Sequence, residues 1–442
     1  MQNPLTFSKK IIKKTYHAAL RSIAFYPVFI SLALFLLAIG TLALENLDVI
    51  VDVKKENPYL FIEDDNTART ILSTLIAGIL SLTVFSFTMV MVVLNQASSN
   101  FSPRLLPGLV SNKRHQLILG FYIGTLLYCT IVLISLGAYQ LENGTVGTST
   151  TIAAILGLVC VALFVSFIHN ISSAIQIQNI VARIYRHTDK ALETLLATEL
   201  QKQTPLKVVA DADFKEIVSK KTGYFEGFDS DLIDAELLKE DIQLVVLPYS
   251  GEHIWEGSPL LKISKRLTEE QEDALRFACT VSKDLHDGNH PLLGLIKLME
   301  IAVRAMSPGI NDPGTALDVV HKIGPLLGKM LRLPAYTSVN EIKRGMVVMK
   351  TNIAGQELLQ TIIQPVRNYA KTDSTVMTGL LSSLTYLKTI SGVSDSDTIA
   401  IDLELRAMLD DIKENITNDK DQRHILRVFK DADARTNNMA LG

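Results

Sequence analysis

Long apolar stretches alternate with short polar segments over the first two-fifths of the chain, and shorter apolar runs among charged residues fill the remainder. Four of the long stretches contain no Asp, Glu, Lys or Arg, and they span residues 24–44, 70–94, 117–138 and 148–168. A helix needs about 20 apolar residues to cross the hydrocarbon core, and these runs are too long for barrel strands. The pattern predicts four transmembrane helices, and the alternative is a set of buried helices in a soluble protein.

Basic residues predict the orientation of these helices. The arm of residues 1–23 and the segments after the second and fourth stretches are rich in Lys and Arg, whereas the first intervening loop carries mostly Asp and Glu. The positive-inside rule therefore places both termini in the cytoplasm. The first stretch is longer than the apolar region of a signal peptide, and no A-x-A cleavage site follows it, so we interpret it as an anchor.

The remainder of the chain predicts a cytoplasmic α+β region. Apolar residues at helical spacing indicate a connector helix over residues 169–205 that continues the fourth span, or else a separate amphipathic helix on the membrane surface. Short β-rich runs between Gly, Pro and Asp indicate a small β domain over 206–265. Its turns at 222–224 and 249–260 resemble a biotinyl/lipoyl-type sandwich, without a Met-Lys-Met carrier site. Helical periodicity then predicts a helical bundle over 266–442.

Composition excludes several function classes. The formal net charge of −3 gives no indication of nucleic-acid binding. Cys129, Cys160 and Cys279 have no metal-ligand spacing, so neither disulfides nor a zinc site nor any other cofactor is predicted. The sequence contains no P-loop, HExxH or GxSxG motif, and we therefore do not expect an enzyme.

Several segments resemble a bacterial family. They are Asn95-Gln96-Ala97-Ser98-Ser99-Asn100-Phe101-Ser102-Pro103-Arg104, the Leu119–Thr125 and Phe167–Gln176 segments, and Arg304-Ala305-Met306-Ser307-Pro308-Gly309-Ile310-Asn311-Asp312-Pro313. Together they resemble predicted membrane proteins that carry domain of unknown function 2254, over nearly the whole chain. The resemblance implies a multi-pass protein of the bacterial inner membrane and supplies no activity. Asn289-His290 stands where many relatives carry Gln-Asp, so no acidic role is carried over to that point.

One stripe of the second span is polar or small. Its members, at spacings of four, three and seven residues, are Thr74, Gly78, Ser81, Thr88 and Asn95. Such a stripe can line a water-filled pore, and it can also be the face on which membrane helices pack. The two interpretations coincide if several subunits pack around one axis.

The Ser307–Pro313 segment predicts a helix–turn–helix. Asp312 is placed to cap the second helix, and Pro313 suits its first position. The same geometry offers two ligand sites. Backbone N–H groups with Arg304 and Ser307 suit an anion, whereas Asn311, Asp312 and Glu300 suit a cation.

Arg104 and His169 are candidates for an interface or a switch, and a cluster near residue 287 is weighed as a metal site. Arg104 is placed to meet anionic lipid head groups at the inner surface. His169 falls at the expected membrane boundary, where it is either a proton-sensitive switch or an interfacial residue bonded to a neighbouring helix. Asp284, His286, Asp287 and His290 have a metal-like spacing, but Gly288 and Pro291 interrupt any helix there, so a solvated loop is favoured over a metal site.

Two functional hypotheses follow from this organisation. The first is an oligomeric inner-membrane channel or transport-related protein, regulated or assembled by its cytoplasmic region and passing ions or small solutes. The spans contain no charged residue, which argues against a proton-coupled pump. The second is a membrane-anchored sensor or scaffold that binds a cytoplasmic protein or a small ligand.

Overall fold

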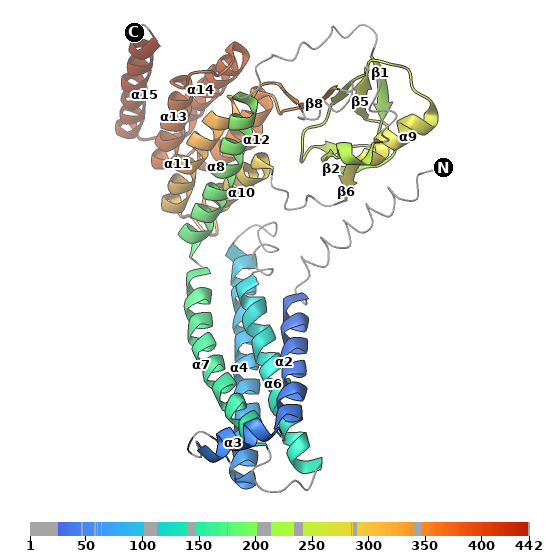
Figure 1. Cartoon of the computed structure of the whole chain (residues 1–442). Coiled ribbons are helices and arrows are strands. Elements are labelled where there is room, and N and C mark those ends of the chain that lie inside the picture. The colour runs from blue at the N-terminus through green and yellow to red at the C-terminus, as the bar shows by residue number, and fades with distance from the viewer. Residues whose placement is uncertain are drawn as a thin grey trace. The chain divides into compact units, whose positions relative to one another are not determined.

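The computed structural model describes residues 25–45, 47–56, 64–100, 113–138, 146–174, 176–200, 214–233, 242–283, 290–338 and 347–440, together with Tyr59, Phe61, Ile62 and Leu285. The chain divides into two compact units, of which the first ends at Gln176 and the second begins at Ile177. We call them the membrane unit and the C-terminal unit (Figure 1).

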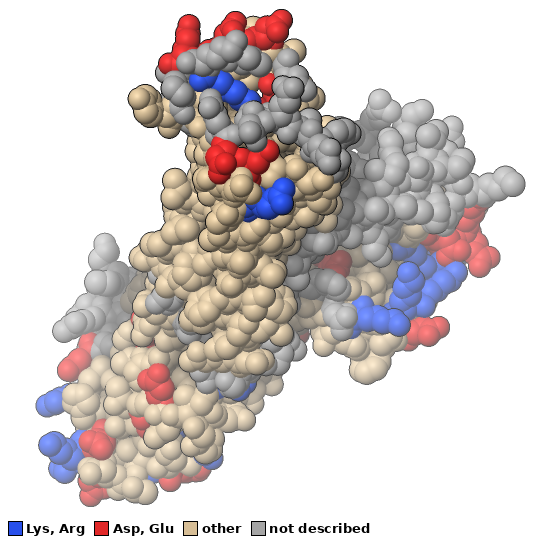
Figure 2. Space-filling view, turned by 90° about the horizontal axis from the view of Figure 1, so that it is seen from below, with Lys and Arg blue, Asp and Glu red and all other residues tan. Residues whose placement is uncertain are grey.

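The membrane unit is built on four long helices, which are α2 (Phe25–Leu44), α4 (Asp65–Asn100), α6 (Lys113–Ala138) and α7 (Gly147–Ala174). All four are long and apolar enough to cross a membrane, as the sequence predicts. The 36 residues of α4 give a length of about 54 Å, so its polar ends extend beyond the hydrocarbon core. Figure 2 shows a broad surface on which no described Lys, Arg, Asp or Glu lies.

Helix α6 is the central helix of this bundle. It packs against α2, α4 and α7. In its most apolar 18-residue stretch 44% of the residues are buried, whereas the corresponding share is 17 to 22% in the other three helices. Two glycines let α2 approach closely. A methyl group at Gly120 would lie 2.8 Å from Pro27 Cα, and one at Gly124 would lie 3.1 Å from Ser31 Cα. Small residues four apart allow this kind of close contact between membrane helices.

A polar network closes the end of the bundle where α2 ends and α7 begins. The carboxylate of Glu45 forms an ion pair with Lys54 of the short helix α3 (Asp48–Glu56), and both side chains are buried. Its second oxygen accepts the backbone N–H of Ser149 in the first turn of α7, at 2.6 Å. Tyr128 of α6 joins the network by donating to Ser149 O at 3.2 Å, and its hydroxyl lies 3.0 Å from Thr41 Oγ1.

The C-terminal unit contains a bundle of helices, as predicted for its later part. They are α8 (Ile177–Leu200), α10 (Pro291–Ala305), α11 (Pro313–Met330), α12 (Gly355–Ala370), α13 (Ser374–Lys388), α14 (Asp395–Asn415) and α15 (Asp419–Ala440). The predicted connector over 169–205 is not one continuous helix, because α7 ends at Ala174 and α8 begins at Ile177. Helix α8 instead packs on α10 and α11, where Gly294 leaves space for Thr188.

The β-structure extends beyond the predicted 206–265 segment. A five-stranded sheet has the order β1 (Lys215–Val218), β5 (Pro259–Ile263), β3 (Gln243–Val246), β8 (Val347–Thr351) and β7 (Tyr336–Ser338). A second sheet has the order β4 (His253–Ile254), β2 (Gly223–Phe228) and β6 (Cys279–Ser282). Strands β6, β7 and β8 come from the segment predicted as purely helical. The first residues of the predicted β domain, 206–213, lie outside the described residues.

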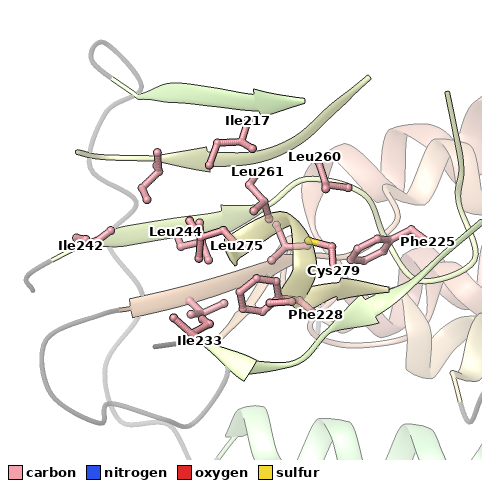
Figure 3. Packing of buried hydrophobic residues seen from close by; sticks show 14 of the residues in the cluster. Ile217, Phe225, Phe228, Ile233, Ile242, Leu244, Leu260, Leu261, Leu275 and Cys279 are labelled. Atoms are coloured by element: carbon pink, nitrogen blue, oxygen red, sulfur yellow. The ribbon is translucent and has the colours of Figure 1, made fainter. Parts of the chain in front are cut away.

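Apolar side chains from both sheets and from α9 (Glu269–Ala278) form one core (Figure 3). Leu244, Leu261 and Ile217 of the larger sheet are fully buried, and Phe225 of β2 and Leu275 of α9 pack into the same cluster. Strand β8 pairs in parallel with β3, whereas β5 pairs with β3 in the antiparallel direction. This mixed sheet does not confirm the biotinyl/lipoyl-like sandwich, because one of its central strands arrives from beyond α11.

Candidate functional site

The polar stripe of α4 faces away from the other helices of its own bundle. Its five members, Thr74, Gly78, Ser81, Thr88 and Asn95, are all exposed. The opposite face of the helix packs inward through Ile79, Ser86 and Val93, which are buried. The stripe is therefore not the surface on which α4 packs within one chain.

The hydroxyl groups of the stripe are bonded within the helix itself. Each donates to the backbone carbonyl four residues earlier, at 2.8 Å for Thr74, 3.0 Å for Ser81 and 2.9 Å for Thr88. These bonds satisfy the donors and leave each hydroxyl oxygen able to accept a hydrogen bond. A methyl group at Gly78 would meet nothing within 4 Å. The stripe can thus accept hydrogen bonds from water, or it can admit a second helix at close range.

The Ser307–Pro313 segment forms the predicted helix–turn–helix between α10 and α11. Asp312 is the N-cap of α11: its carboxylate accepts the Thr315 N–H at 3.0 Å and the Thr315 hydroxyl at 2.6 Å. These bonds lower the pKa of Asp312. Pro313 occupies the start of the helix, as predicted. Asn311 has a φ of 47°, a left-handed conformation that asparagine tolerates better than most residues.

The other candidate ligand residues around this turn are Ser307, Glu300, Arg304 and Asn311, and Ser307 contributes a hydrogen bond to the turn itself. Ser307 donates its hydroxyl to Arg304 O at 2.7 Å. Glu300 and Arg304 lie one turn apart on α10 and are partly buried, whereas Asn311 and Asp312 are exposed. A hollow of about 80 Å³ lies near the turn, between the first turns of α8 and α11, and Gln178, Thr315 and Asp318 line it. Asp318 is paired with Lys322 there.

Of the two interface candidates, Arg104 and His169, the structure describes only His169. Arg104 lies outside the described residues. His169 is exposed on α7, and its neighbour Asn170 accepts a hydrogen bond from Arg114 of α6 at 3.3 Å. This bond ties α6 to α7 near the end of the span.

Of the metal-like cluster, only His290 belongs to the described residues. Its Nδ1 accepts the Leu292 N–H at 3.4 Å, so His290 is the N-cap of α10. Burial, with a contribution from the charge of Lys350, lowers the pKa of His290 to about 4. Burial also lowers the pKa of Lys350. The cap position explains why a histidine followed by Pro291 occurs at this point of the chain.

Sequence reasoning missed a groove of about 300 Å³ on the C-terminal unit. It lies between α11, α13 and α15, and its lining includes His321 and His424 on the two outer helices. The sequence feature that points to the groove is a row of short side chains on α13 at one-turn spacing, Ser374, Thr378 and Ser382. Such a row is also typical of an ordinary helix-packing face.

The comparisons with known proteins agree with this architecture. A family model described as "Predicted membrane protein (DUF2254)" matches residues 20–386. The chain belongs to the DUF2254 family. Proteins of Mycobacterium bovis and Mycobacterium tuberculosis, named only as uncharacterized, are similar to it at 23% identity over 372 residues, which covers 81% of this chain and 71% of theirs. No solved structure matches the chain. The DUF2254 match spans both units, so the membrane helices and most of the C-terminal unit belong to one family architecture.

Proposed function

We propose that this protein is an oligomeric channel or transport-related protein of the bacterial inner membrane, with both termini in the cytoplasm. Its C-terminal unit then regulates or assembles the subunits, and no catalysis is assigned to it. The observation that carries the proposal is the outward direction of the α4 stripe, which a single chain leaves uncovered.

A row of hydroxyl groups facing lipid gains nothing from hydrocarbon contact, whereas the same row gains hydrogen bonds beside water or a polar partner. A ring of subunits that places α4 at its axis satisfies this preference. One exposed side chain of the span suits lipid instead. Leu80, which is 51% exposed, lies about 160° around the helix from Gly78 and presents an apolar surface suited to lipid.

The test compares two variants of the full chain reconstituted in planar bilayers. Gly78→Leu places a bulky side chain in the middle of the stripe, and Leu80→Phe adds volume on the lipid-facing side. We expect conductance and an oligomeric mass for the wild type and for Leu80→Phe, and loss of both for Gly78→Leu. A monomeric wild type, or one without conductance under varied voltage, tension and ionic conditions, contradicts the proposal.

A sensor or scaffold is the second candidate, and the groove of the C-terminal unit favours it. A sensor requires a site where a ligand changes the protein, and this groove has the size of one. This alternative expects partners in a crosslinked pull-down that disappear when α11 to α15 are deleted, and an absence of conductance.

A further inference from the structure

The groove of the C-terminal unit exists because the middle of its three helices has short side chains. Helix α13 packs against both α11 and α15. Its residues on this side recur at one-turn spacing and are Ser374, Thr378, Gly379 and Ser382. The resulting volume of about 300 Å³ is at the lower end of the range for small-molecule sites.

Two imidazoles and a carboxylate form the walls. Leu317 and His321 of α11 lie over the floor, because a methyl group at Gly379 would be 2.3 Å from Leu317 Cδ1 and 3.6 Å from His321 Nε2. Asp421 and His424 of α15 form the other wall, and Ile425 gives it an apolar base. The groove therefore combines ring faces, hydrogen-bonding groups and apolar surface.

The hydrogen-bonding roles of two of these groups are fixed by their neighbours. His424 Nδ1 lies 3.3 Å from Arg427 Nη2, and a guanidinium can only donate. With Nδ1 as the acceptor of this bond, Nε2 carries a hydrogen and can donate to a ligand. Thr378 donates its hydroxyl to Ser374 O at 2.6 Å, so its oxygen can only accept from a ligand. Asp421 is a second acceptor.

The lining of the groove offers an anion no cation. Among the described residues that line it, Asp421 is the acid and none is Lys or Arg, and the nearest cation shown is Arg427, which contacts His424 from outside the lining. A carboxylate accepts both hydrogens of a ribose diol, as in dinucleotide sites, and a histidine ring stacks on a base. We propose that this groove binds an uncharged nucleoside, with its ribose diol on Asp421 and its base against His321. This inference does not depend on conductance through the membrane unit.

The experiment is a calorimetric titration of the full chain in detergent with adenosine and, separately, with adenosine monophosphate. We expect saturable binding of adenosine and weaker binding of the monophosphate, whose charge opposes Asp421. Asp421→Asn removes the charge that holds the diol and is expected to weaken adenosine binding at least tenfold. Ser382→Leu fills the floor of the groove and is expected to abolish binding. Asp419→Asn is the matched control, since Asp419 is exposed on the same turn of α15 and does not line the groove.

The calorimetric results either support or overturn nucleoside binding in this groove. Saturable adenosine binding that both groove variants lose and the Asp419→Asn control keeps supports the proposal, provided that the variants melt at the wild-type temperature. Absence of adenosine binding, binding that Asp421→Asn leaves unchanged, or tighter binding of the monophosphate than of adenosine overturns it.

Discussion

The Glu45 carboxylate accepts the backbone N–H of Ser149 at 2.6 Å and so joins the end of α2 to the first turn of α7. The same carboxylate is paired with Lys54 of α3. Both charged side chains are buried, so their ion pair helps to compensate the cost of removing each charge from water. One residue after the first apolar span thus holds three helices together at this end of the bundle.

Removing this carboxylate is expected to be costly. Glu45→Ala removes the ion pair with the buried Lys54 and takes the acceptor from the Ser149 N–H, and breaking a buried pair costs about 3 to 5 kcal/mol. We expect a clearly lower melting temperature in detergent, measured by thermal aggregation of the purified chain. Glu56→Ala removes an exposed acid at the end of α3 and is expected to melt like the wild type. Equal melting of Glu45→Ala and wild type would contradict the role given to this carboxylate.

The apolar pattern predicted the spans because charge is excluded from them. It did not predict α3, whose sequence carries five charged residues in Asp48–Glu56 and lacks a long apolar run. That helix is held by Lys54 on Glu45, a contact between neighbours that hydropathy does not encode. The four spans were placed correctly, but their polar ends, such as Asp65 and Lys113, were left out for the same reason.

The mixed sheet and the groove were beyond sequence reasoning for a different reason. Strand β8 pairs with β3 across about a hundred residues of intervening chain, and local periodicity contains no information on such a partner. The groove combines side chains from three helices, none of which forms a motif alone. By contrast, Asp312 and Pro313 were predicted correctly, because capping depends on residues that are adjacent in the chain.

The contact between Gly294 of α10 and Thr188 of α8 predicts a steric effect. A methyl group at position 294 would lie 1.9 Å from Thr188 Oγ1 and 3.0 Å from its Cβ, so the helices must separate. We expect Gly294→Ala to destabilise the C-terminal unit by about 1 to 3 kcal/mol, the usual cost of overpacking. The measurement is a denaturant titration followed by tryptophan fluorescence of Trp255.

Gly309→Ala is the matched control for this substitution, because a methyl group there meets nothing within 4 Å. The two variants make the same chemical change in the same unit. If both shift the unfolding midpoint equally, the close packing of α8 on α10 is not the cause.

The cap of α10 predicts a pH dependence. Since the folded pKa of His290 is about 4, below its ordinary value of 6.5, the unfolded chain binds the proton first as the pH falls. The contribution of uncharged His290 to the free energy of unfolding is complete above about pH 6.5 and is lost as the pH falls toward 4. The maximum loss is about 3 kcal/mol. Protonation of Nδ1 also removes the acceptor for Leu292.

His290→Asn isolates this effect, because asparagine also caps helices and does not titrate in this range. Melting curves of both proteins between pH 4 and 7 provide the measurement. We expect the wild type to lose stability over this interval relative to His290→Asn. Parallel pH profiles would show that His290 is not the group responsible.

Loss of the Asp312 N-cap of α11 is expected to lower the free energy of unfolding by less than protonation of His290 does. Asp312→Ala removes the two bonds to Thr315 and is expected to cost about 1 kcal/mol, whereas Asp312→Asn retains a capping oxygen and is expected to cost less. Denaturant titrations of both variants measure the difference. If the variant with asparagine is as unstable as the one with alanine, the charge of Asp312 matters more than its capping bond.

The two interpretations of the α4 stripe predict opposite labelling results. Cysteine at Ser81 reacts quickly with a water-soluble thiol reagent if the stripe lines a water-filled path. If the stripe is a dry contact between subunits, the same cysteine stays unlabelled and forms a disulfide with a second copy under mild oxidation. Cys129, Cys160 and Cys279 are buried, so the wild-type protein gives a low background.

Leu80→Cys provides the lipid-facing reference on the same helix. We expect it to react slowly in either case, because a lipid-covered thiol is neither hydrated nor close to another copy. A water-filled path is therefore recognised from the difference in labelling rate between Ser81→Cys and Leu80→Cys, and not from the absolute labelling rate of either variant. Equal labelling of Ser81→Cys and Leu80→Cys, without crosslinking of either, would mean that the whole exposed face of α4 lies against lipid, and it would remove the basis for a channel built around this helix.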